Sequence, residues 1–173
     1  MEGSLIKMGL FDRLFGDKSQ VSVADGDIVA IADGELIDVH SVSDNVFASE
    51  MMGKSCAFRF DKEKVTLCSP VNGTLTVMFP TGHAFGITGN DGVEIIVHCG
   101  IDTVSAKGAG FHVLKKKQGD TVRAGDPIVE VGVRTLSEKY DMSTILIITK
   151  DNGRQIEFIA PGKVEKGQSL IRK

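Results

Sequence analysis

Residues 81–100, TGHAFGITGNDGVEIIVHCG, decide the expected fold, because they read as two short apolar strands joined by a tight turn. Asn90 and Asp91 stand between two glycines, and these residue types readily adopt the left-handed backbone of hairpin loops. A two-residue loop at Asn90-Asp91 would place His83 directly opposite His98 in an antiparallel pair. Their Cβ atoms would then lie about 4.5–5.5 Å apart on one face of the sheet.

The alternation of side chains along a strand extends this face. Thr81 is expected on one side of His83, and Phe85 and Ile96 on the other side of the histidine pair. Cys99 follows His98 directly and is expected to point to the opposite face. Cys99 is therefore a poor candidate as a partner of His98 in a metal site or as a catalytic thiol.

A facing pair of imidazoles admits two chemistries, although a single histidine in a strand is most often an ordinary polar residue. Two rings so close do not both take up a proton readily, so each stays neutral near pH 7 and keeps a nitrogen lone pair. Zinc ligation is one chemistry, and it needs a third protein ligand. The other is attack on phosphorus by one ring while its neighbour donates an N–H group to the oxygens.

The rest of the chain predicts an all-β protein. Short apolar segments separated by glycines read as strands, namely IVAIADGELIDV (28–39), CAFRFDKEKVTLC (56–68), GTLTVMF (73–79), DPIVEVG (126–132), TILIITK (144–150) and IEFIA (156–160). Two pairs of segments echo one another: ADGELIDV with VNGTLTVM, and GDTVRAGDPI with GKVEKGQSL. We expect an antiparallel β-sandwich or barrel built from two similar motifs with a few short helices.

Two parts of the chain are expected to differ from this pattern. VRTLSEKYDMS, residues 133–143, reads as a helix between the predicted strands. All of these elements belong to a single domain, which we place over residues 20–173. Residues 1–19 form a tail in which Leu10, Phe11, Leu14 and Phe15 would share one side of an amphipathic helix. That helix either lies on a membrane surface or packs on the domain.

Composition excludes several classes of protein. The formal net charge of −3 argues against nucleic acid as a partner. Three cysteines without CxxC spacing argue against a disulfide framework or zinc knuckle and indicate free thiols in a reducing compartment. No apolar run approaches the roughly 20 residues of a membrane span, and the amino terminus lacks a secretory pattern. We expect a cytosolic protein.

HAFGI (83–87) followed by GVEIIVHCGIDTV (92–104) resembles the signature of the glucose-class enzyme IIA of the bacterial phosphoenolpyruvate-dependent sugar phosphotransferase system. MGLFDRLFG, VSDNVFASEMMG, FPTGHAF and VRAGDPIVEV extend the resemblance over almost the whole chain. It implies a monomeric cytosolic β-sandwich, at most peripheral at the inner face of the membrane, that requires no cofactor. Such a carrier takes a phosphoryl group from the histidine phosphocarrier protein HPr and passes it to a cysteine of the IIB domain of a sugar permease.

The resemblance also assigns residues. It makes His98 the phosphorylated histidine, His83 the histidine that contacts the phosphoryl oxygens, and Thr81 the hydroxyl that orients His83. The implied docking face consists of Asp44, Val46, Phe47, Phe79, Phe85, Ile96 and Asp102. Cys99 stands where the family usually has a bulky apolar residue, and we expect altered packing or sensitivity to oxidation there, but no loss of activity. Gly82 is also less usual, and we expect it to loosen the contact of Thr81 with His83.

Three other functions require features that can be checked against the sequence. A zinc metallopeptidase on a similar sandwich would need an HxH motif, which is absent, although His40 and His98 each start an HxxxD pattern. A biotinyl or lipoyl carrier would need a lysine at an exposed hairpin tip, and none is present. A regulatory binding module, which would bind transporters or kinases in its unphosphorylated state, is compatible with the carrier. Zinc would then be shared between His83, His98 and a carboxylate of the partner.

Overall fold

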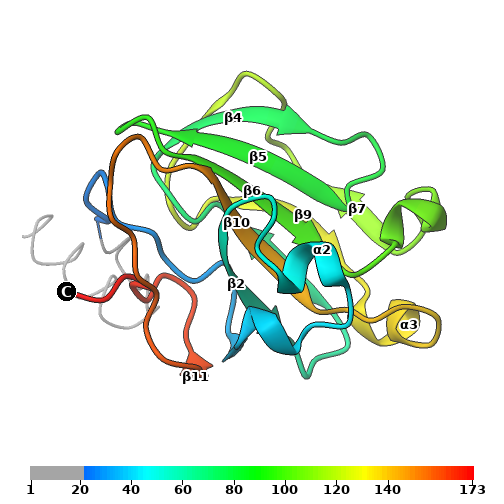
Figure 1. Ribbon diagram of the computed structural model, residues 1–173. Helices are drawn as coiled ribbons and strands as arrows, with labels where there is room; N and C mark the ends of the chain where they lie inside the picture. Colours follow the sequence, from blue (N-terminus) through cyan, green and yellow to red (C-terminus); the bar gives the residue numbers. More distant parts are fainter. Residues whose placement is uncertain (1–21) are drawn as a thin grey trace, which may run out of the picture.

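The alternating apolar segments form strands in the computed structural model, which describes residues 22–173, and every strand pairing is antiparallel (Figure 1). The larger sheet has eight strands, in the order β11 (Gly162–Val164), β1 (Gly34–Ile37), β2 (Lys54–Arg59), β10 (Thr144–Lys150), β6 (Glu94–Cys99), β5 (Ala84–Gly89), β4 (Gly73–Met78) and β8 (Thr121–Val122). The smaller sheet has the order β3 (Val65–Cys68), β9 (Pro127–Val131) and β7 (Phe111–Val113).

Helical segments in this part of the chain are short. They are the α-helices α2 (Asn45–Ala48) and α3 (Val133–Ser137) and the 3-10 helices η1 (Val39–Ser41) and η2 (Thr103–Ala106). The expected all-β sandwich with a few short helices is confirmed. The predicted helix over 133–143 is correct in place but too long, because the chain must turn after Ser137 to enter β10 at Thr144.

The echoes in the sequence correspond to equivalent strand pairs. Gly34 of β1 pairs with Val164 of β11, and Gly73 of β4 pairs with Val122 of β8. The turn after each partner is held alike: Gly167 N–H donates to the Ala30 carbonyl over 2.9 Å, and Gly125 N–H donates to the Ser69 carbonyl over 2.8 Å. The prediction of two similar β-motifs is therefore confirmed.

One predicted strand is wrong. Residues 156–160 form only an isolated bridge, between Phe158 and Ile171, and not a strand. The tail predicted over residues 1–19 lies outside the described residues. None of the helices within 22–173 is long and apolar enough to cross a membrane.

Apolar side chains gather on both faces of the larger sheet. The main core lies between the two sheets and contains, among others, Phe58, Leu75, Phe85 and Ile128. A smaller cluster on the outer face joins Val39, Val42, Ala57, Ile101, Ile145 and Ile147, with Phe47 and Ile96 packed against it. Figure 1 shows α2 lying in front of this outer face, over β2 and β10. The smaller cluster thus fixes α2 beside the strand that carries His98.

Candidate functional site

The hairpin of β5 and β6 has a different register from the predicted one. Ala84, not His83, stands opposite His98, and the pairing continues to Thr88 and Glu94. Gly89 N–H donates to the Val93 carbonyl over 2.8 Å, so the loop has one residue more than expected and ends at Gly92, whose φ is +86°. Such a loop is a common alternative to the two-residue turn, with glycine in its left-handed position.

His83 nevertheless lies beside His98, because it precedes β5 and is not bound by the alternation of the strand. Gly82 has a φ of +77°, which turns the backbone just before the histidine. The His83 carbonyl accepts from Cys99 N–H over 2.7 Å. The centroids of the two imidazole rings are 5.3 Å apart, and their planes meet at 82°.

The backbone determines which nitrogen of His98 is free. Nδ1 of His98 lies 2.8 Å from the Gly100 carbonyl oxygen. A carbonyl only accepts hydrogen bonds, so Nδ1 carries the proton and donates. In the neutral ring, Nε2 then holds the lone pair. Gly100 has a φ of +77°, a conformation suited to glycine, and this turns its carbonyl toward the ring.

Thr81 contacts the second ring through its hydroxyl group. Its hydroxyl oxygen lies 2.5 Å from Nδ1 of His83. When the hydroxyl donates this bond, the neutral His83 ring carries its proton on Nε2 and can donate it outward. The two Nδ1 atoms are thus engaged with different partners, and the Nε2 atoms remain available for chemistry: one with a lone pair and one with an N–H group.

Both rings are held in the neutral form. The pKa of His98 is lowered from its ordinary 6.5, first by burial and then by repulsion from His83, against smaller opposing effects of the Gly100 carbonyl, Asp44 and Asp102. The pKa of His83, whose side chain is buried, is lowered by loss of hydration. A neutral His98 keeps its nucleophilic lone pair at pH 7.

Two phenylalanines extend the imidazole pair into a row of four rings. The Phe47 ring lies 5.0 Å from that of His98, and the Phe79 ring lies 5.2 Å from that of His83, measured between centroids. Phe79 is 40% exposed and Phe47 half-buried, so the row reaches the surface. Apolar side chains therefore flank both imidazoles.

Four other predicted docking residues surround this row. Asp44 caps α2, since its carboxylate accepts from the backbone N–H groups of Val46 (2.8 Å) and Phe47 (3.1 Å). Val46 is exposed, and Ile96 is half-buried on the same face as His98. Asp102 is exposed at the start of η2, with a left-handed backbone.

Phe85 does not belong to this surface, and its predicted position is wrong. It pairs with Val97, is 1% exposed and packs in the main core. The shift of one residue in the hairpin register turns Phe85 to the face opposite His98. Cys99 lies in the same core as expected, 1% exposed, and burial raises the pKa of its thiol to about 12. It is therefore a poor nucleophile.

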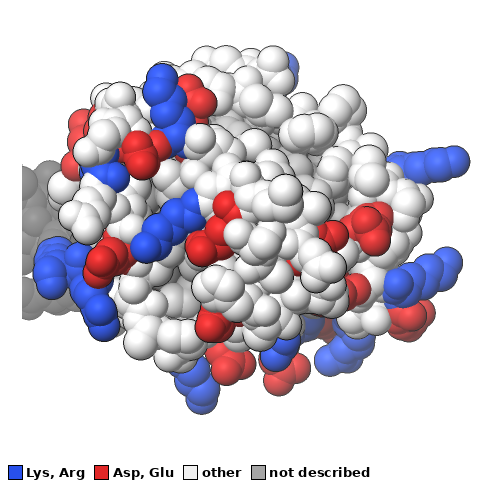
Figure 2. Space-filling model, viewed as in Figure 1, with Lys and Arg blue, Asp and Glu red and all other residues white. Residues whose placement is uncertain are grey.

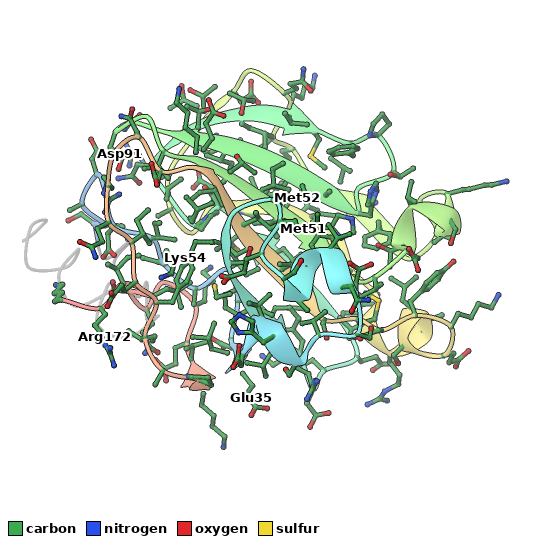
Figure 3. All side chains as sticks on the ribbon, in the orientation of Figure 1. Glu35, Met51, Met52, Lys54, Asp91 and Arg172 are labelled. Atoms are coloured by element: carbon green, nitrogen blue, oxygen red, sulfur yellow. The ribbon has the colours of Figure 1, made fainter. Side chains whose placement is uncertain are left out.

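Three exposed apolar side chains in or just after the short helices α2 and η2 were not predicted from the sequence. Met51 (77% exposed) and Met52 (44%) follow α2, and Val104 (57%) lies in η2, two residues after Asp102. Figure 3 shows both methionines beside α2. In Figure 2 the surface over α2 is mostly uncharged, with acidic groups next to it and most basic groups at the outline. The signal in the sequence that could have identified Met51, Met52 and Val104 was the presence of apolar residues in segments expected to form turns.

No group of three or more histidine, cysteine, aspartate or glutamate side chains suited to a metal ion occurs within residues 22–173. Cys56, Cys68 and Cys99 are all buried free thiols. His40 bonds to Asp38 at the surface, over 2.7 Å, and His112 is exposed on β7. The histidine pair therefore supplies two possible ligands and no third.

Comparison with known proteins agrees with this geometry. The family model for the phosphoenolpyruvate-dependent sugar phosphotransferase system, EIIA 1, matches residues 26–154. The glucose-specific EIIA component of Haemophilus influenzae is 37% identical over 95% of this chain and 97% of its own length. The corresponding Staphylococcus aureus component is 34% identical, over 94% of this chain and 96% of its own length.

A solved structure and a longer relative extend the comparison. The glucose permease IIA of Mycoplasma capricolum superposes with a TM-score of 0.79 at 34% identity, covering 86% of this chain and 96% of that one. The chain spans only 23% of the glucose-specific EIICBA component of Staphylococcus carnosus, to which it is 34% identical over 90% of its own length. With the fold, the paired histidines and the full-length matches in agreement, the chain belongs to the EIIA 1 family of the phosphoenolpyruvate-dependent sugar phosphotransferase system, a family of phosphoryl carriers.

Proposed function

We propose that Nε2 of His98 accepts a phosphoryl group from the phosphohistidine of HPr and passes it to a cysteine thiolate of a IIB domain, in the course of sugar uptake and phosphorylation. In the first step a bond forms between Nε2 and phosphorus while the bond between phosphorus and the donor nitrogen breaks. The electron pair of that broken bond stays on the donor ring. The second step repeats the displacement with sulfur as the attacking atom.

The observation that carries this proposal is the hydrogen bond from His98 Nδ1 to the Gly100 carbonyl, beside a second imidazole. It leaves the lone pair on Nε2, where an incoming phosphorus is attacked. His83, oriented by Thr81, would donate its Nε2–H to the phosphoryl oxygens. Fixed donors of this kind stabilise the charge that develops during transfer.

The surroundings of the pair suit contact with other proteins. Val46, Phe47, Phe79 and Ile96 would form the apolar part of the docking face, and excluding water there slows hydrolysis of a phosphohistidine. Asp44 and Asp102 would attract a basic partner and steer its approach. Phe85 is left out of this face because its side chain is buried.

The longer relatives support the choice of acceptor. The Staphylococcus carnosus proteins named EIICBA components contain a segment similar to this chain. Their fusion with IIB and IIC parts fits a IIB domain as the protein that receives the phosphoryl group. The core between the two sheets supports a single carrier domain over residues 20–173, working at the cytoplasmic side of a permease. Residues 1–19 would form a tail that either touches lipid or packs on this domain.

The family requires no cofactor. Zinc belongs to this proposal only in a regulatory complex. The free nitrogens of His83 and His98 would provide two ligands, and a carboxylate of the bound partner would provide the next, since a stable site needs at least three protein ligands.

The test is incubation of the protein with phosphoenolpyruvate, Enzyme I and HPr. One phosphate per chain, labile in acid and stable in base, is expected, and His98→Ala should take up none. His83→Gln should accept phosphate but pass it poorly to a IIB domain. Uptake at another histidine, or undiminished uptake by His98→Ala, would overturn the proposal.

A further inference from the structure

Asp141 lies far from His98 in the sequence, in the turn that leads into β10. It nevertheless bonds to Ile101, which follows His98 by three residues, and to Ser43, which precedes the helix α2 that packs against His98. We infer that Asp141 is a positioning residue for phosphoryl transfer: through one backbone and one side-chain bond it fixes the Gly100–Ile101 peptide and the approach to α2. This inference rests on the proposed role of His98. Nothing in the sequence pattern or in the resemblance singles out Asp141.

The first connection acts on the carbonyl that selects the nucleophilic nitrogen. The Asp141 carbonyl accepts from Ile101 N–H over 2.8 Å. That N–H group and the Gly100 carbonyl belong to the same planar peptide unit, so fixing one end fixes the other. The Gly100 carbonyl in turn holds Nδ1 of His98. Asp141 is therefore two hydrogen bonds away from the imidazole ring.

The side chain of Asp141 stiffens the turn that makes this bond. Its Oδ1 accepts from both the backbone N–H (2.9 Å) and the hydroxyl (2.7 Å) of Ser143. The Ser143 carbonyl then accepts from Gly100 N–H over 3.1 Å. Both N–H groups that bracket the Gly100 residue are thus held by the turn 141–143, whose shape depends on one carboxylate.

The second connection acts on α2. Oδ2 of Asp141 accepts from the Ser43 hydroxyl over 2.8 Å. Ser43 directly precedes Asp44, the cap of the helix that presents Val46 and places the Phe47 ring against His98. Asp141 thereby couples the position of the docking helix to the position of the His98 ring. Burial raises the pKa of Asp141, but the bonds from Ser143 and Ser43 and the nearby Arg59 outweigh it and lower the pKa.

Four variants of the full chain separate these connections. Asp141→Ala removes both side-chain links, and Ser43→Ala removes only the link to α2. Asp141→Asn keeps the shape, with an oxygen for Ser143 and an amide group that can bond the Ser43 hydroxyl. Glu138→Ala is the matched control, because it removes an exposed carboxylate from the same segment, where its side chain makes no hydrogen bond to residues 22–173.

Three measurements are made on each variant: the ¹⁵N shifts of the His98 ring, which report the tautomer, the kinetics of uptake from phosphorylated HPr, and the thermal midpoint. Asp141→Ala should mix the two tautomers and lower kcat/KM about two- to tenfold, as expected for a lost hydrogen bond. Ser43→Ala should raise KM and leave the tautomer unchanged. Asp141→Asn should behave nearly as the parent, and Glu138→Ala fully so.

Several results would overturn the inference. One is an Asp141→Ala protein that matches Glu138→Ala in tautomer and kinetics. Another is a loss of activity that follows the thermal midpoint alone, which would make Asp141 merely structural. Impairment of Asp141→Asn equal to that of Asp141→Ala would mean that charge acts and not geometry. The tautomer is read without phosphate, so it tests Asp141 even if His98→Ala still takes up phosphate and the proposed function fails.

Discussion

The imidazole rings of His83 and His98 lie edge to face, with their centroids 5.3 Å apart and their planes at 82°. Each ring has its Nδ1 atom engaged by a different partner, the Thr81 hydroxyl or the Gly100 carbonyl. The two rings are consequently inequivalent. In the proposed function, the Nε2 lone pair of His98 attacks phosphorus and the Nε2–H group of His83 donates to the phosphoryl oxygens. The predictions below follow from this difference.

Uptake of phosphate should persist to a lower pH than an ordinary histidine would allow. Burial and the neighbouring ring lower the pKa of His98 from 6.5, so the midpoint of kcat/KM on the acid side is expected below pH 6.5. His83→Gln removes the repulsion and should move this midpoint upward. Comparing the two proteins with the same donor cancels the donor's own pH dependence. An identical midpoint in both would contradict the coupling of the rings.

The same lowered pKa values affect stability. The unfolded chain binds protons on these histidines near pH 6.5, before the folded chain does, so the free energy of unfolding falls as pH drops from about 6.5 through the lowered folded pKa values. Above pH 6.5 their contribution is fully present. Urea unfolding of the parent and of His98→Gln at a series of pH values should show a shallower decline in the variant.

Loss of the Thr81 hydroxyl should impair transfer more than stability. Thr81→Val removes the bond to Nδ1 of His83 and lets its ring adopt either tautomer. We expect onward transfer to a IIB domain to slow about two- to tenfold, the range of one net hydrogen bond. Thr81→Ser retains the hydroxyl and should restore most of the rate. Rapid-quench measurement of phosphate loss from the phosphorylated variants checks this, and equal rates for Val and Ser would refute it.

The sequence predicted the hairpin but not its register. Two glycines flank Asn90-Asp91, and both a two-residue loop and a loop ending at Gly92 satisfy the same residue preferences. The choice depends on tertiary contacts, such as the bonds of Asp91 with Arg154 (2.6 Å) and of the Asp91 carbonyl with Asn152 (2.8 Å). These contacts join segments about 60 residues apart and have no local signature.

His83 and His98 lie side by side as predicted, although the predicted register of the hairpin was wrong. His83 lies one residue before β5, after the left-handed Gly82, where strand alternation does not apply. Phe85 lies inside the strand and therefore turned to the core. The positions of Thr81 and Ile96 were predicted correctly, whereas the part played by the Gly100 carbonyl was not, because a backbone group leaves no trace in a sequence.

Gly100→Ala should damage the site more than a comparable change elsewhere. Its backbone is left-handed, and an added Cβ would overlap the Thr103 methyl group and come within 3.0 Å of the Met142 sulfur. Gly119 is also left-handed but has open space around it, so Gly119→Ala should cost only about 1–2 kcal/mol of stability. We expect a larger loss for Gly100→Ala, with mixed His98 tautomers by ¹⁵N NMR. Equal losses would show that packing around Gly100 is unimportant.

Phe85 and Phe79 provide the sharpest test of the corrected register. Phe85→Ala should lower the free energy of unfolding by about 3–5 kcal/mol, because the side chain is 1% exposed in the main core. Phe79 is 40% exposed and touches His83, so Phe79→Ala should change stability by less than about 1 kcal/mol. It should instead raise KM for phosphorylated HPr. Urea titrations and uptake kinetics distinguish the two variants. A stable Phe85→Ala protein with weakened docking would instead support the register predicted from the sequence, with His83 opposite His98.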